Sequence, residues 1–209
     1  IDANETVVAT TKTPTNPKAP AEGALLGAQH VMRAAGIKWH QVSGKIHGTT
    51  LATNALIERR GAKVATITTA GFRDTLEIAY ERRYSQYAIN IEKPNLLVPR
   101  QLSYTIAGRM NAAGEELTSL DSTAIPALAA EVRRQNVQAV AVCLMHAYAN
   151  PAHEQTLGTE LRKLLPGVEI SLSHEVSPEA REFDRLCTTI ANAYIQPLMK
   201  TYLSDFEAR

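Results

Sequence analysis

The segment His47-Gly-Thr-Thr-Leu-Ala-Thr-Asn-Ala55 combines residue types that bind phosphate or carboxylate groups. A helix that begins here presents backbone N–H groups, which attract anions. Gly48 lets a ligand approach the backbone, and further donors come from the hydroxyl groups of Thr49, Thr50 and Thr53. The alternative is that Thr50 or Thr53 only caps the helix and that His47 is packed, since threonine is a common cap. The segment is not a Walker A loop, because no Gly-Lys-Thr or Gly-Lys-Ser ends it.

A second candidate is Thr68-Thr-Ala-Gly-Phe-Arg-Asp74, which follows a predicted strand. Thr69 offers a hydroxyl group, Arg73 a partner for an anion, and Asp74 a partner for a cation or for Arg73. The competing interpretation is a turn with a local Arg–Asp pair, which contributes only about 0–1 kcal/mol when exposed.

Two further polar stretches favour structural roles. Leu144–Glu154 holds His146, His153 and Glu154, but their spacing matches no zinc motif of the His-Glu-x-x-His kind, so we expect no metal site. Ser173–Arg185 carries alternating charges, which are typical of a solvated helix face. A subunit interface reached by Glu175 and Arg181 is the alternative.

The elements that position these residues alternate between strand and helix. Strands are predicted at 6–12, 42–46, 63–69, 137–145 and 168–173, and helices at 21–35, 53–60, 72–80, 121–135, 151–165 and 178–208. Strands separated by helices pair in parallel, and an open α/β sheet binds ligands at the carboxyl ends of its strands. The loops after Ile46 and after Thr69 are therefore expected at the same edge. Pro197 is expected to kink or split the last helix.

These elements give an α/β protein with three parts. We expect a partial α/β domain over residues 1–80, an inserted α/β subdomain over 81–176 and a C-terminal helix over 177–209. Residues 82–120 have an irregular pattern that indicates hairpins and loops, with a strand over Ser103–Met110 and a turn at Ala113-Gly114. Ile1–Val8 reads as part of a hairpin, so we expect residues upstream of it.

Composition excludes several classes of protein. The chain has 209 residues, a formal net charge of +1, 44% hydrophobic and 21% charged residues, and no strongly basic run. A nucleic-acid-binding protein usually has a basic face, and a membrane protein needs about 18 consecutive apolar residues, so neither is expected. The two cysteines, Cys143 and Cys187, form no disulfide framework, and we expect a cytoplasmic protein.

Several of these motifs, in this order, resemble the hydantoinase A/5-oxoprolinase family and its acetone and acetophenone carboxylase relatives. The resemblance rests on His47–Arg59, Lys63–Asp74, Leu97–Arg100, His146–Glu154, Ser173–Glu179 and Thr188–Tyr194 with Pro197.

The resemblance implies a ribonuclease-H-like (actin-like ATPase) fold that binds ATP with Mg²⁺ between two domains. The family's two phosphate loops are absent here and are expected before Ile1 and beyond Arg209. The implied activity is phosphorylation and opening of a cyclic amide or imide such as a hydantoin or 5-oxoproline, with His47 and Asn54 as catalytic residues. A hydantoinase B-like subunit or domain is the implied partner, in an oligomer. Carboxylation of a ketone, or a non-catalytic assembly role, are the alternatives.

Overall fold

The computed structural model describes residues 1–2, 4–14, 16, 19–81, 85, 87, 89–91 and 94–208. The chain divides into two compact units, which we call unit 1 (Ile1–Leu51 with Met199–Arg209) and unit 2 (Ala52–Leu198). The segment 82–120, expected to form hairpins and loops, lies partly outside the described residues. The boundaries expected at 80/81 and 176/177 stay predictions.

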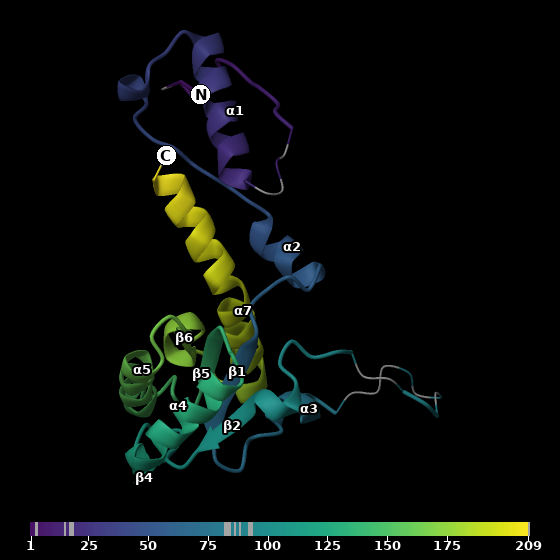
Figure 1. Cartoon of the computed structure of the whole chain (residues 1–209), viewed down its shortest axis with the longest axis vertical. Helices are drawn as coiled ribbons and strands as arrows, with labels where there is room; N and C mark the ends of the chain where they lie inside the picture. The colour runs from purple at the N-terminus through teal and green to yellow at the C-terminus, as the bar shows by residue number, and fades with distance from the viewer. Residues whose placement is uncertain are drawn as a thin grey trace. The chain divides into compact units, whose positions relative to one another are not determined.

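Unit 2 is built on a four-stranded parallel sheet in the order β2-β1-β5-β6 (Figure 1). The strands are β1 (Val64–Thr69), β2 (Ser103–Ile106), β5 (Ala139–Cys143) and β6 (Glu169–Leu172). Every residue of β1 and β5 is buried, because the two central strands are covered on both faces. The strands predicted at 63–69, 137–145 and 168–173 are therefore confirmed.

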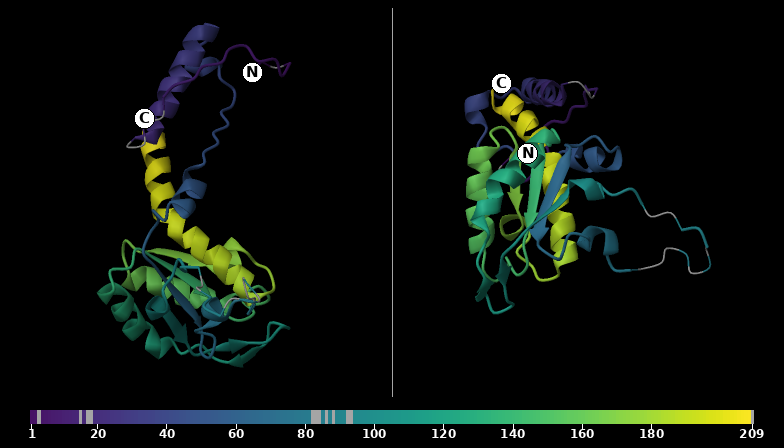
Figure 2. Two further views of the ribbon diagram at one scale, coloured as in Figure 1. Left: turned by 90° about the vertical axis from the view of Figure 1, so that its right-hand side faces the viewer. Right: turned by 60° about the horizontal axis from the view of Figure 1, so that its bottom comes forward.

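Helices cover both faces of this sheet (Figure 2). The connections that carry α4 (Ile125–Arg134) and α5 (Ala152–Leu164) cross the sheet in the same direction, so right-handed crossovers place both helices on one face. The connection with α3 (Thr75–Ile78) runs the opposite way. The first half of α7 (Glu182–Glu207) adds Leu186 and Ile190 to the same core.

Short elements complete unit 2. The strands β3 (Arg109–Met110) and β4 (Glu116–Thr118) form an antiparallel hairpin, and the Asn111 side chain accepts hydrogen bonds from two backbone N–H groups of its turn. The 3-10 turns η2 (Arg100–Leu102) and η3 (Ser122–Ala124) precede β2 and α4. The Asp121 carboxylate caps η3 by accepting from the backbone N–H of Thr123.

Close packing fixes one glycine of unit 2. A Cβ atom on Gly61 would lie 2.1 Å from the ring atoms Cδ1 and Cε1 of Tyr194 on α7. The neighbouring Ala62 donates its N–H to the carbonyl of Tyr194 at 2.9 Å. The turn that closes α2 (Leu51–Ile57) is therefore pinned against α7 at a position where only glycine fits.

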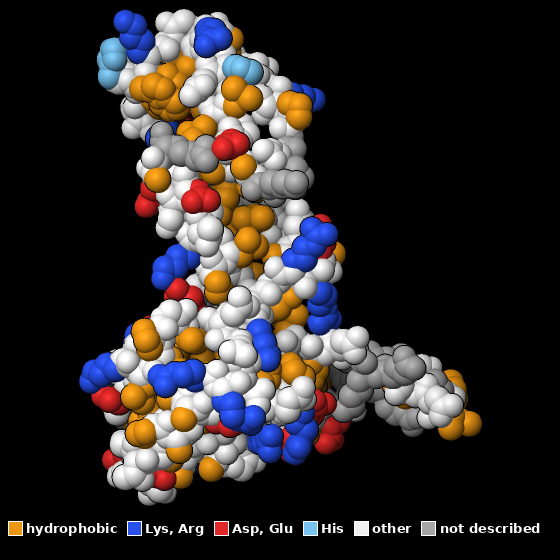
Figure 3. All heavy atoms as spheres, in the orientation of Figure 1, with side chains coloured by type: hydrophobic (Ala, Val, Ile, Leu, Met, Phe, Trp, Pro, Cys, Tyr) orange, Lys and Arg blue, Asp and Glu red, His pale blue; other side chains and the backbone are white. Residues whose placement is uncertain are grey.

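Unit 1 contains α1 (Pro20–Ala35), the 3-10 turn η1 (Trp39–Gln41) and the end of α7. Pro20 begins α1 and Gly36, with φ +67°, ends it as predicted. Large apolar side chains lie exposed in this unit, among them those of Val7, Trp39 and Ile46 (Figure 3).

Two predicted strands are wrong. Within the described residues neither 6–12 nor 42–46 forms a strand, and no other strand lies in unit 1. β-branched residues favour a strand only where a partner strand satisfies the backbone, and among the described residues these segments have none. The argument that the loop after Ile46 follows a strand of the sheet therefore fails.

The start of the last helix is also corrected. Ser173–Val176 forms the short helix α6, Arg181 adopts a positive φ of 77°, and α7 begins only at Glu182. The Arg185 guanidinium donates to the carbonyl of Glu179, which holds residues 177–181 as a turn. Pro197 lies inside α7 and does not split it.

Candidate functional site

The imidazole of His47 is held by two aromatic side chains from the end of α7. Its Nε2 lies 2.6 Å from the hydroxyl oxygen of Tyr202. Its ring stacks on Phe206 at a centroid distance of 4.9 Å and on Tyr202 at 5.8 Å. All three residues belong to unit 1. Local sequence gave no signal for Tyr202 or Phe206, because 155 residues separate His47 from Tyr202.

The polar residues that follow His47 in the segment are exposed to solvent. Gly48, Thr49, Thr50, Thr53 and Asn54 are exposed, and a Cβ atom on Gly48 would meet nothing within 4 Å. The hydroxyl oxygen of Thr49 accepts from the backbone N–H of Leu51 at 3.2 Å, so Thr49 supports the start of α2. The segment therefore exposes hydroxyl and amide groups that a ligand can reach.

Thr69 joins the carboxyl ends of the two central strands in unit 2. Its hydroxyl oxygen accepts from the backbone N–H of Met145 at 3.0 Å, and Thr69 itself is buried. The strand order places β2 and β5 on either side of β1, so the connections that leave β1 and β5 run in opposite directions along the sheet. Such a switch point is the usual ligand crevice of an open α/β sheet.

A small pocket lies at this switch point. Its cavity volume is about 10 Å³, which is room for about one water molecule, and it is lined by Thr68, Thr69, Phe72, Thr75, Cys143, Met145, Glu182 and Leu186. Burial raises the pKa of the Cys143 thiol to about 11, so this cysteine is a poor nucleophile at neutral pH.

Arg73 and Asp74 make contacts within unit 2. The Arg73 guanidinium donates to the carbonyl oxygens of Ser103 at 2.9 Å and Arg100 at 3.3 Å. Asp74 accepts two hydrogen bonds from Arg100, at 2.6 and 3.1 Å, and these lower the pKa of the Asp74 carboxyl group. The expected local pair between Arg73 and Asp74 is replaced by this pair with Arg100.

The two polar stretches at 144–154 and 173–185 meet in one buried network. Glu154 is 0% exposed and accepts from the backbone N–H groups of Leu144 and His174, the Ser173 hydroxyl and Nδ1 of His174. Arg185 is 1% exposed and donates to Ser173 and to the carbonyl oxygen of Leu144. The prediction that Arg185 belongs to a solvated face is wrong, because the helix turns this side chain toward the sheet.

The histidines of the first stretch also have protein partners. Nε2 of His153 lies 2.7 Å from the Glu116 carboxylate, and Nδ1 of His146 lies 3.1 Å from the Tyr148 hydroxyl. Among the described residues, no three His, Cys, Asp or Glu side chains are grouped to hold a metal ion. These contacts support the structural interpretation of His146, His153 and Glu154.

Comparison with solved structures gives the class of the fold. The chain matches the crystal structure of the ATP-dependent caprolactamase from Pseudomonas jessenii with a TM-score of 0.82 and 36% identity, over 95% of this chain and 30% of that one. It matches the nucleotide-free structure of acetone carboxylase with a TM-score of 0.76 and 21% identity, over 93% of this chain and 30% of that one. The predicted fold class, an α/β layer of the ribonuclease-H-like (actin-like ATPase) kind with a long C-terminal helix, is confirmed.

Sequence comparison then gives the family. Residues 1–165 match the hydantoinase/oxoprolinase N-terminal region, and the chain belongs to this family. It is 41% identical over 165 residues to caprolactamase subunit alpha of Pseudomonas jessenii, covering 78% of this chain and 24% of the relative. It is 27% identical over 222 residues to 5-oxoprolinase of Saccharomyces cerevisiae, covering 92% of this chain and 17% of the relative. The chain thus spans less than a third of the length of these relatives.

Proposed function

We propose that this chain is part of an ATP-dependent enzyme that opens a cyclic amide or imide. The observation that carries the proposal is the match of residues 1–165 to the hydantoinase/oxoprolinase N-terminal region, together with 41% identity to a caprolactamase subunit. In the proposed reaction ATP phosphorylates the oxygen of the ring amide, and water then opens the activated ring. A lactam, a hydantoin or 5-oxoproline is the proposed class of substrate.

The proposed phosphate or substrate site is the exposed segment from His47 to Asn54. Phosphoryl transfer needs donors that are already in place around the transferred group. The open backbone at Gly48 and the exposed hydroxyl groups of Thr50 and Thr53 suit phosphate oxygens, and His47 and Asn54 supply nitrogen donors. The segment contains no carboxylate, so Mg²⁺ enters the proposal only as the ion that accompanies ATP.

Thr69, Arg73 and Asp74 are proposed as further phosphate- or substrate-binding residues. Their contacts with Met145, Ser103 and Arg100 support a role in holding the ligand edge of the sheet. Substitution at these positions is therefore expected to reduce activity less than substitution at His47 or Asn54.

The partner and setting are proposed from the relatives. Caprolactamase subunit alpha and acetophenone carboxylase gamma subunit are, by name, parts of larger assemblies. We propose a hydantoinase B-like subunit or domain as the partner, in a cytoplasmic oligomer. No helix of the described residues is long and apolar enough to cross a membrane.

The test is phosphate release from ATP by the longer polypeptide that this proposal implies, assayed with its B-like partner. Release that depends on a lactam, hydantoin or 5-oxoproline supports the proposal. Release that depends on a ketone with bicarbonate points instead to a carboxylase, which the acetophenone carboxylase relative, 25% identical over 167 residues, also suggests. Absence of release in both assays favours the assembly role.

Substitutions then test the segment itself. His47→Ala or Asn54→Ala is expected to lower kcat by about 100- to 1000-fold, the usual loss when one preorganised donor is removed. His40→Ala is the matched control, because His40 is also an exposed histidine of unit 1. Wild-type turnover in the His47 and Asn54 variants would overturn the assignment of this site.

A further inference from the structure

The end of α7 gives His47 two restraints of different kinds. Phe206 and Tyr202 limit the tilt of the imidazole by stacking, with interplanar angles of 22° and 29°. The Tyr202 hydroxyl limits its rotation through the 2.6 Å contact with Nε2. Tyr202 is only 6% exposed, whereas His47 is exposed. A buried phenol therefore anchors a histidine that solvent and ligands can reach.

The hydrogen bond also selects a tautomer. A neutral imidazole has one donor nitrogen and one acceptor nitrogen, and a partner at one nitrogen decides the role of the other. The phenol O–H is a stronger donor than a neutral ring N–H, so Tyr202 donates to Nε2. Nδ1 then carries the proton and is a donor, which suits an anionic oxygen of a phosphate or a phosphorylated substrate.

We propose that Tyr202 is a positioning residue, which together with Phe206 orients the His47 ring and holds it as the tautomer that donates from Nδ1 to an anionic ligand oxygen. This inference rests on the proposed function of His47. It adds two residues from the far end of the chain to the site, neither of which belongs to the segment 47–54 itself.

The test uses the same longer polypeptide with its partner. Tyr202→Phe keeps the ring and removes the hydroxyl group, and is expected to lower kcat by about ten- to a hundredfold, because a small misplacement of a reacting group has effects of that size. KM is expected to change less than kcat, since the other donors proposed in the segment 47–54 keep their contacts with the ligand. Phe206→Leu is expected to lower kcat less, because the hydrogen bond to Tyr202 remains.

The matched control is Tyr104→Phe. Tyr104 also has a buried hydroxyl group, and among the described residues that hydroxyl has no hydrogen-bond partner. Removing it is expected to leave kcat unchanged. If Tyr104→Phe lowers kcat as much as Tyr202→Phe does, the loss comes from a general packing defect and not from the contact with His47. That result would overturn the proposal.

Ring ¹⁵N spectra of the chain report which nitrogen of His47 carries the proton, and a change in stability alone does not alter this signal. In the wild type, His47 is expected to show a protonated Nδ1 and an acceptor Nε2, and in Tyr202→Phe a mixture of both tautomers. An unchanged spectrum in Tyr202→Phe overturns the proposal.

A double substitution separates this inference from the proposed function. If Tyr202 acts through His47, the pair His47→Ala with Tyr202→Phe is no slower than His47→Ala alone. Additive losses overturn the positioning role and leave His47 in the site. Full activity of His47→Ala overturns the function proposed for His47 and the positioning role together.

Discussion

Two charged side chains of unit 2, Glu154 and Arg185, are almost fully buried, whereas unit 1 exposes large apolar side chains such as Val7 and Ile46. In unit 2, the hydrogen bonds of Glu154 and Arg185 join the end of β5 to α5, α6 and α7. Unit 1 leaves its polar segment from His47 to Thr50 at the surface, with one anchor at Tyr202. The comparison shows that two charged residues from the polar stretches at 144–154 and 173–185, Glu154 and Arg185, make buried contacts inside unit 2.

The largest expected effect follows from breaking the buried network around Glu154 and Arg185 in unit 2. Arg185→Leu removes a buried guanidinium that donates to Ser173, Glu179 and Leu144, and each buried acceptor left without its donor costs about 1–3 kcal/mol of unfolding free energy. Urea unfolding followed by circular dichroism measures it. Arg134→Leu is the control, because its pair with Glu131 is exposed and contributes about 0–1 kcal/mol. Equal losses of unfolding free energy in the two variants would show that the burial of Arg185 does not add to stability.

A second prediction concerns the alkaline stability of unit 2. The folded pKa of Cys143 is about 11, against 9.0 for the ordinary thiol, so the folded state keeps its proton where the unfolded state loses it. Stability from this group is fully present below pH 9.0 and falls as the pH rises to about 11, by about 2–3 kcal/mol in total.

Urea unfolding across this pH range measures the alkaline loss in the wild type and in Cys143→Ala. Other groups titrate in both proteins, so the difference between the two curves isolates the thiol. Parallel curves would contradict the assigned burial of Cys143.

The smallest expected effect compares one glycine from each unit. Gly61→Ala places a Cβ atom 2.1 Å from the Tyr194 ring and is expected to cost about 1–3 kcal/mol through overpacking. Gly48→Ala meets nothing within 4 Å and is expected to leave the unfolding free energy unchanged. Thermal unfolding of the two variants measures the contrast, and a larger loss for Gly48→Ala would reverse it.

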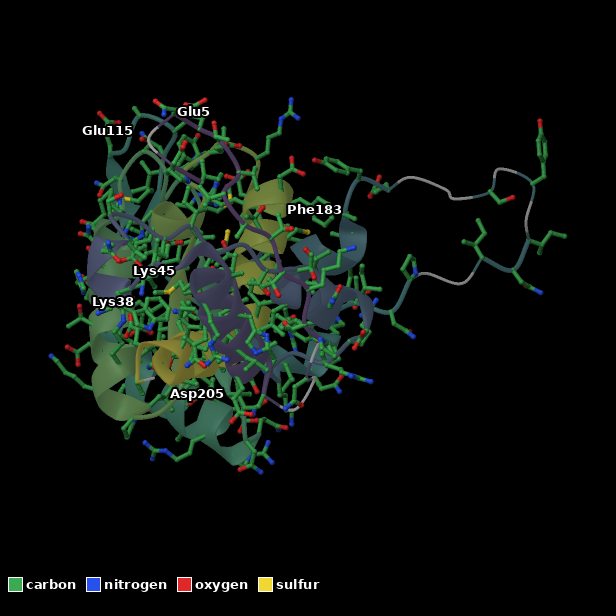
Figure 4. All side chains as sticks on the ribbon, turned by 90° about the horizontal axis from the view of Figure 1, so that it is seen from above. Glu5, Lys38, Lys45, Glu115, Phe183 and Asp205 are labelled. Atoms are coloured by element: carbon green, nitrogen blue, oxygen red, sulfur yellow. The ribbon has the colours of Figure 1, made fainter. Side chains whose placement is uncertain are left out.

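An edge-on aromatic contact joins α7 to the residues that follow α3. Phe183 of α7, labelled in Figure 4, packs against Tyr80 at a centroid distance of 4.9 Å, and the Tyr80 hydroxyl donates to the Asp184 carboxylate. The helix was expected from the sequence near 72–80, but this pairing was not, because it joins residues 104 positions apart.

The sequence predicted the elements of unit 2 well because their signals are local. Val140–Leu144 is a continuous apolar run, and Asn150 before Pro151 marks the start of α5, where the Asn150 side chain accepts from the N–H of Ala152. Val42–Ile46 has the same β-branched character but no partner strand, and pairing is not a local property.

The candidate site was predictable only in part for the same reason. The motif at His47–Asn54 is contiguous, so it was found. Its anchor at Tyr202 and the partner of Asp74 at Arg100 come from distant positions and leave no mark on the local pattern.

The strand order has a consequence for synthesis on the ribosome. Of the four strands of the sheet, β1 is translated first, yet in the folded sheet it lies between β2 and β5. Lys63 and Gln138, which are hydrogen-bonded beside this pairing, are 75 residues apart. At about 5–20 residues per second, the nascent β1 waits several seconds for its second neighbour with apolar residues unpaired. This interval is when chaperones would be needed most.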